Sequence, residues 1–87
     1  MTRDECLDQL SPDEEVVFLE GPEFDIAIMG VAREFNRPAR IAYSVPRVIA
    51  VYASSGMSDE EAIEYFDFNT AGAYMGEATP VFIYEGP

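Results

Sequence analysis

Glycine and proline residues divide this chain into short segments, each with room for one helix or one strand. The main breaks fall at Gly21-Pro22, at Pro38 and at Gly56, because proline ends a helix and glycine lets the backbone turn tightly. The chain has 87 residues, the size of one domain. Its apolar fraction of 48% and aromatic fraction of 13% are typical of a folded chain and not of a disordered acidic tail.

Three segments have the pattern of strands: residues 15–20, 40–45 and 79–85. The first contains the β-branched run VVFL, which suits a strand better than a long helix. In the second, alternation places Ile41, Tyr43 and Val45 on one face. The third begins near Pro80, where a missing backbone donor is tolerated, and its alternation places Phe82 and Tyr84 on one face.

Three further segments predict helices: residues 23–37, a segment from Ser44–Pro46 to Gly56, and a segment from Ser58 to Gly72 or Gly76. In the first helix, one face holds residues that recur at steps of four, three and four: Phe24, Ile28, Val31 and Phe35. Residues 26–32 (IAIMGVA) also fit a central strand, an alternative that Gly30 leaves open. The second helix has an apolar face made of Val45, Val48, Ile49 and Tyr52.

The third helix has the clearest local signal in the chain. Ser58 is followed three residues later by Glu61, which is the spacing of an N-terminal capping box. Its inner face is predicted to hold small and apolar residues: Ala62, Ile63, Phe66, Thr70 and Ala73. Its outer face carries Asp59, Glu60, Glu64 and Asp67.

The resulting order is β-α-β-α-α-β, and we expect an α+β fold. A small three-stranded sheet with about three helices packed on one face is the simplest arrangement of such elements. If the first two strands are neighbours, the helix between them makes a right-handed parallel crossover. Residues 15–87 are expected to form the globular domain, and residues 1–14 a loosely ordered acidic arm or a short helix.

The charge is strongly acidic and unevenly distributed. Seventeen acids oppose five arginines, with no lysine, for a net charge of −12. This charge repels nucleic acid and anionic membranes, and it attracts a basic protein partner. Four of the arginines lie within fifteen residues: Arg33, Arg37, Arg40 and Arg47. They could hold an anionic ligand, but pairing with acids of the same domain or of a second subunit is the favoured interpretation.

The residue inventory excludes most familiar catalytic chemistry. There is no histidine and a single cysteine, Cys6, so the usual metal ligands, the commonest general base and an intramolecular disulfide are absent. Neighbouring carboxylates such as Glu60 and Glu64 point outward from a helix and do not converge as calcium ligands. The glycines of residues 72–76 have no following lysine, so they do not form a phosphate loop. We therefore expect no enzyme activity, no metal and no cofactor.

The sequence also shows no pattern for membrane insertion or secretion. The longest apolar run has seven residues, whereas a membrane span needs about twenty. The first ten residues are charged and have no signal-peptide pattern. A soluble cytoplasmic protein is expected.

Residues 64–82 gather five aromatic side chains and contain no basic one: Tyr65, Phe66, Phe68, Tyr74 and Phe82. Phe66 and Phe82 fit the core, whereas Tyr65, Phe68 and Tyr74 fall among carboxylates. Aromatic side chains bordered by acids are typical of a surface that binds a basic protein partner. The predicted partner-binding residues are Asp59, Glu60, Glu64, Tyr65, Asp67 and Phe68.

The run GMSDEEAIEYFDFNTAGAYMGEATPVFI (56–83), together with residues 24–32 and 42–49, resembles a family of short acidic proteins of bacteriophage and related bacterial genomes. The family pattern reads GM-(S/T)-x-E-E-A, then E-(Y/W/F)-F-E-F-N, then GA-(Y/W)-x-G-E-x-TP. Two departures are visible: Asp67 replaces a glutamate, and residues 44–46 replace a more acidic link without proline. The resemblance implies a small accessory protein of a phage or mobile element, and it implies no catalytic residues.

Two functions are compatible with these observations. The first is a non-enzymatic protein that binds a basic host protein in the bacterial cytoplasm, with carboxylates of the third helix occupying a groove built for phosphates, as in an inhibitor of a CRISPR effector or another nucleic-acid-binding protein. The alternative is a homo-oligomeric module, a homodimer or larger, in which residues 33–47 contact acids of another subunit. Direct nucleic-acid binding is not expected, because the aromatic residues lack basic neighbours.

Overall fold

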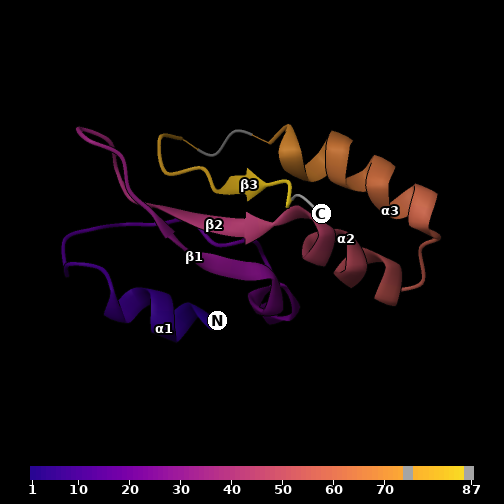
Figure 1. Cartoon of the computed structure of the whole chain (residues 1–87), viewed down its shortest axis with the longest axis horizontal. Helices are drawn as coiled ribbons and strands as arrows, with labels where there is room; N and C mark the ends of the chain where they lie inside the picture. Colours follow the sequence, from indigo (N-terminus) through magenta and orange to yellow (C-terminus); the bar gives the residue numbers. More distant parts are fainter. Residues whose placement is uncertain (74–75, 86–87) are drawn as a thin grey trace.

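A three-stranded mixed sheet lies at the centre of the protein (Figure 1). The computed structural model describes residues 1–73 and 76–85. The sheet consists of β1 (Ile28–Ala32), β2 (Arg40–Ser44) and β3 (Val81–Ile83), in that order. The central strand β2 pairs antiparallel with β1 and parallel with β3.

Helical segments lie before β1 and between β2 and β3 in the chain. They are α1 (Arg3–Asp8), the 3₁₀ helix η1 (Pro22–Ala27), α2 (Val45–Ser54) and α3 (Asp59–Tyr65), which continues as the π-helical segment η2 (Phe66–Ala71). Helix α2 continues directly from β2, and α2 and α3 pack side by side beyond that end of the sheet (Figure 1). Together they form the crossover that a parallel strand pair requires, here between β2 and β3. The predicted α+β class is therefore confirmed.

The first half of the chain differs from the predicted strand and helix. Residues 15–20 form no strand, because β1 occupies the free edge of β2 and the Leu19 N–H donates to Tyr43 Oη at 2.9 Å. The predicted helix over residues 23–37 is also wrong: η1 ends at Ala27 and β1 begins at Ile28. The alternative of a strand within residues 26–32 is confirmed, but β1 lies at the edge of the sheet and not at its centre as expected. A shift in the β1–β2 register between Ile28 and Gly30 marks a bulge in this strand.

Phe35, predicted to lie on the buried face of that helix, is 93% exposed. It lies in the turn that joins β1 to β2, where the Arg37 N–H donates to the Glu34 carbonyl at 3.2 Å. Asn36 in this turn has a φ of 62°, a left-handed conformation that asparagine tolerates better than most residues. The steps of three and four therefore reflect chance spacing across a 3₁₀ helix, a strand and a turn.

The second half of the chain agrees closely with its pattern. In β2, Ile41 and Tyr43 are buried as expected, and Ala42 and Ser44 on the other face are buried too, because β2 is the central strand. In α2, Val48 is fully buried, and Ile49 and Tyr52 pack at the edge of the core. The Ser58–Glu61 capping box is present in full.

Two apolar residues of this half are more exposed than predicted. Ile63 of α3 is partly exposed, while Ala62, Phe66 and Thr70 are buried. Since successive helical residues are about 100° apart, Ile63 lies at the margin of the stripe that these three define. Tyr84 is 70% exposed because β3 ends at Ile83.

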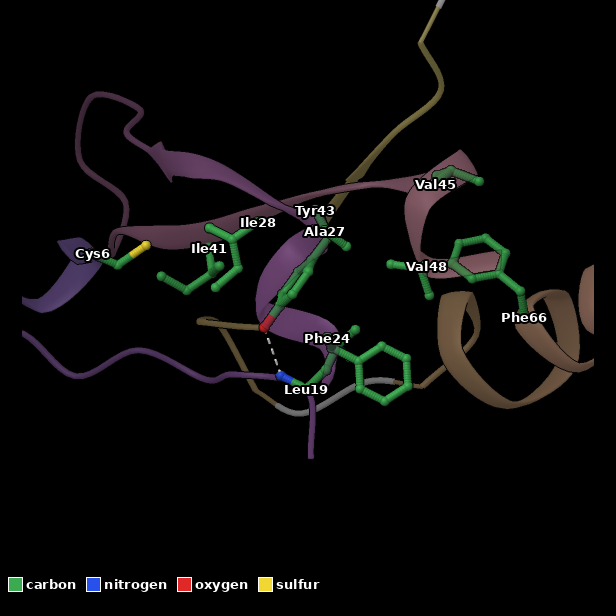
Figure 2. Packing of buried hydrophobic residues seen from close by; sticks show 10 residues of the cluster. All are labelled: Cys6, Leu19, Phe24, Ala27, Ile28, Ile41, Tyr43, Val45, Val48 and Phe66. Carbon is green, nitrogen blue, oxygen red and sulfur yellow. Dashed lines mark hydrogen bonds between the residues drawn. The ribbon is translucent and has the colours of Figure 1, made fainter. Parts of the chain in front are cut away.

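The core is a continuous strip of buried side chains (Figure 2). One end contains Cys6 of α1 with Ile28 and Ile41, and the other contains Val48 and Phe66 (Figure 2). The N-terminal segment, expected as a loose arm or a short helix, thus contains a helix that contributes a buried side chain. In the described part of the chain, no helix is long and apolar enough to cross a membrane.

Helix α1 is held against the loop before β1 by one arginine. Arg3 Nε contacts Asp25 Oδ1 at 2.7 Å, and its Nη2 donates to the carbonyls of Leu19 and Gly21 at 3.2 and 2.9 Å. The same guanidinium lies 5.1 Å from the centre of the Phe18 ring, a cation–π arrangement. These contacts connect both segments that precede the sheet.

Candidate protein-binding groove

A hollow of about 650 Å³ lies between η1, α2 and α3. We call it the groove, and it is lined by Glu23, Phe24, Ile26, Val51, Tyr52, Ser54, Ser55, Met57 and Tyr65. Three rings form its base: Tyr52 packs edge to face against Phe24 at 5.3 Å and against Tyr65 at 4.9 Å between ring centres. Such pairs fix ring orientations beyond what burial alone does. The groove is thus a preformed, mostly apolar depression.

Local sequence signals place these rings. Gly56, with a φ of 112°, lets the chain reverse after α2. Ser58 then accepts from the Glu61 N–H at 3.2 Å and starts α3, so that α3 packs beside α2 and Tyr65 meets Tyr52. A 2.5 Å hydrogen bond between Tyr52 Oη and Thr70 Oγ1 fixes the hydroxyl end of the Tyr52 ring against η2.

Two smaller hollows extend the groove at its ends. One, of about 320 Å³, shares Met57 and Tyr65 with it and adds Glu61, Glu64 and Phe68. The other, of about 420 Å³, shares Ile26, Val51 and Ser54 and adds Arg47. Along this surface Ile26 is 68% exposed and Phe68 is 82% exposed. An apolar surface of this kind bordered by polar residues is typical of an interaction site.

The structure brings together half of the predicted partner-binding residues. Glu64, Tyr65 and Phe68 line one continuous surface with Met57. The other three, Asp59, Glu60 and Asp67, are exposed on α3 and η2 but line none of the hollows described above. The remaining aromatic candidate, Tyr74, lies outside the described residues.

Sequence reasoning missed the η1 side of the groove, which supplies Glu23, Phe24 and Ile26. The sequence pattern places these residues in a long helix over residues 23–37. Pro22 was the available signal, because a proline followed by acids also starts a short 3₁₀ turn. Their approach to α2 depends on tertiary packing that no local pattern reveals.

The border of the groove and of the hollow beside it is acidic. Among residues 1–73 and 76–85, Glu23, Glu61 and Glu64 form no ion pair. Glu61 Oε1 accepts from the Ser58 N–H at 3.1 Å, which lowers the pKa of Glu61. The Glu61 carboxylate therefore remains charged at neutral pH, and none of these three acids is occupied by an ion pair within the described residues.

The arginines are mostly used within the chain. Arg33 contacts Glu14 at 2.9 Å, while Arg40 and Arg37 contact Glu34 at 2.9 and 3.2 Å. The favoured interpretation was pairing with acids of the same domain or of a second subunit, and pairing within the domain is found for three of the four clustered arginines. Arg47 forms no ion pair with any residue that the structure describes.

Neither metal ligands nor similarity to known proteins adds to the description of this site. The described residues contain no group of three or more side chains able to hold a metal ion. No family model, no curated protein and no solved structure matches the chain.

Proposed function

We propose that this protein is a non-enzymatic binding protein that attaches to a basic host protein through α3 and the adjoining groove. The observation that carries the proposal is a preformed apolar groove bordered by carboxylates that form no ion pair with the residues described by the structure. Buried aromatic anchors supply much of the affinity of protein interfaces, and complementary charge speeds encounter and selects partners. Both parts are found on one surface.

The concrete form of the proposal is a phage-type accessory protein that acts in the bacterial host cell as a nucleic-acid mimic. Asp59, Glu60, Glu64 and Asp67 would occupy phosphate sites of a defence or other nucleic-acid-binding protein, while Tyr65 and Phe68 supply apolar anchors. The support is chemical: seventeen acids are present and only three of them, Glu14, Asp25 and Glu34, pair with arginine in the described residues. The resemblance to short acidic phage proteins is compatible with this setting.

The test is capture of a partner from the lysate of a bacterium that carries the gene, followed by competition with DNA or RNA. One basic, nucleic-acid-binding protein, retained at low salt and displaced by nucleic acid, is the expected result. Retention that nucleic acid leaves unchanged would argue against mimicry.

A matched pair of variants locates the surface. Reversing Glu60 and Glu64 together to arginine should abolish capture, whereas reversing Asp13 and Glu15 changes the net charge equally at exposed positions away from the groove and should leave capture largely intact. Circular dichroism and thermal unfolding confirm that both variants fold. Equal losses in the two variants would indicate a net-charge effect and not a site on α3.

A further inference from the structure

The turn between β1 and β2 presents an aromatic side chain that is almost fully exposed to solvent. Phe35 is 93% exposed in the segment 34–38, which we call the hairpin tip. Figure 1 shows this tip at one end of the molecule and α2 with α3 at the other, along an axis of 40 Å. A fully exposed phenylalanine at a protruding turn has no role in the fold and is the kind of residue that anchors an interface.

The charges beside Phe35 include two arginines, whereas the protein as a whole is strongly acidic. Arg37 and Arg40 flank it and share Glu34, and Glu77 lies beside them. The closest approach of Arg37 to Glu34 uses Nε at 3.2 Å, so its two terminal nitrogens remain available as donors. Exposed pairs of this kind contribute little to stability, so these arginines can exchange partners easily. The tip is thus an aromatic anchor with arginine donors.

The groove has the complementary features. Its base is apolar, Glu23 lines it, and Glu61 and Glu64 line the smaller hollow that adjoins it at Met57 and Tyr65. None of these three acids has an ion-pair partner in the described residues. Its volume of about 650 Å³ is ample for one phenyl ring and a neighbouring guanidinium. The tip and groove lie at opposite ends, so a tip meets the groove of another copy and not its own.

We propose that two copies of this chain associate head to tail, with Phe35 of one copy inserted in the groove of the next and Arg37 facing the acids at its border. The contact is heterologous, because it joins two different surfaces, so it leaves one tip and one groove free and extends to a ring or a filament. This gives the homo-oligomeric alternative a specific interface. It does not depend on the proposed host partner, although such a partner would compete for the same groove.

The net charge of −12 on each copy opposes association only over short range. At physiological ionic strength the Debye length is about 8 Å, much shorter than the molecule. The charges that decide the contact are therefore those at the tip and at the border of the groove.

The test is sedimentation of the whole protein at physiological ionic strength over a range of concentrations. The wild type should form dimers and larger species. Phe35→Ser should weaken association by about 30-fold or more, as expected for an anchor whose removal costs about 2 kcal/mol. Ile26→Arg, at an exposed position inside the groove, should do the same by filling the site with a positive charge. Ser54→Arg serves as a second groove variant if Ile26→Arg does not fold.

Mixing the two variants gives the decisive result. Each alone should be monomeric, but an equimolar mixture should form dimers that contain one copy of each, since one intact groove and one intact tip remain. A monomeric wild type, unchanged association of Phe35→Ser, or a mixture that stays monomeric would each overturn the proposal. Host capture separates the two ideas, because Phe35→Ser should still retain a host partner and Ile26→Arg should not.

Discussion

Tyr43 Oη accepts a hydrogen bond from the Leu19 N–H at 2.9 Å, and both residues are buried (Figure 2). This bond joins the segment before η1, which forms no strand, to the central strand of the sheet. Burial raises the pKa of the Tyr43 phenol, so the hydroxyl keeps its proton through neutral pH.

Tyr43→Phe should destabilise the protein by about 1–3 kcal/mol, because the Leu19 N–H loses its partner in a site that water does not reach. Chemical denaturation measures this change, and faster hydrogen exchange of the Leu19 amide would locate it. Tyr84→Phe is the matched control, since Tyr84 is 70% exposed and its hydroxyl remains in contact with water. Equal effects of the two substitutions would contradict a role for this bond.

The same bond explains why the first strand was predicted wrongly. Residues 15–20 have the composition of a strand, but their composition does not reveal that β1 pairs with β2 first and that a tyrosine side chain then satisfies Leu19. At residues 26–32, a strand forms in place of the predicted helix because β1 pairs with β2, with a bulge beside Gly30. Long-range contacts thus determine the structure of both segments, whereas local sequence patterns are sufficient to predict α2 and α3.

Ser58→Ala should destabilise the protein by about 1 kcal/mol. Ser58 Oγ accepts from the Glu61 N–H at 3.2 Å, while the Ser58 N–H donates to Glu61 Oε1 at 3.1 Å. Thermal unfolding measures the loss. Ser54→Ala is a useful comparison, because the Ser54 hydroxyl donates to the Ala50 carbonyl within α2 and caps no helix. A larger loss for Ser54→Ala would contradict the capping role of Ser58.

The Glu14–Arg33 pair should make stability depend on acid pH. The hydrogen bonds from Arg33 lower the pKa of Glu14 from 4.5 to about 2. Since the folded-state pKa is depressed, the contribution is fully present above about pH 4.5 and is lost as pH falls toward 2. The size is small because the pair is exposed to solvent.

A pH series of thermal unfolding for the wild type and for Glu14→Gln measures this effect. The wild type should be the more stable protein at neutral pH, and the difference should disappear near pH 2. An NMR titration of the Glu14 carboxyl gives the pKa directly. A midpoint near 4.5 would show that Arg33 does not hold this carboxylate in solution.

Phe68→Ala should separate binding from folding. Phe68 is 82% exposed, so its removal should change the free energy of unfolding by less than about 0.5 kcal/mol. Loss of an interface anchor costs about 2 kcal/mol of binding free energy, so capture of the host partner should fall by roughly 30-fold. Phe66→Ala is the contrasting variant, because Phe66 is fully buried and its loss should cost about 3–5 kcal/mol of stability. Unchanged capture by Phe68→Ala would remove this ring from the interface.

The sequence located one wall of the groove and not the other. Tyr65, Phe68 and Glu64 were recognisable because aromatic side chains stood among acids where the apolar stripe of α3 predicted none. Ile26 and Phe24 were not, since they belong to a short 3₁₀ helix whose neighbours are set by the packing of η1 on α2. The spacing of Phe35 continues a helical face that the structure does not contain, so the sequence did not indicate the hairpin tip.

Cys6 offers a direct measure of how firmly α1 is attached to the rest of the protein. Its thiol is fully buried, and this burial raises the pKa of Cys6. A thiol reacts as its thiolate, so labelling by a disulfide reagent at neutral pH should be much slower in the native protein than after unfolding. Arg3→Ala removes the contacts with Asp25 and with the Leu19 and Gly21 carbonyls and should speed labelling severalfold through local opening of α1. If native Cys6 reacts as fast as the unfolded chain, α1 is a loosely attached arm in solution.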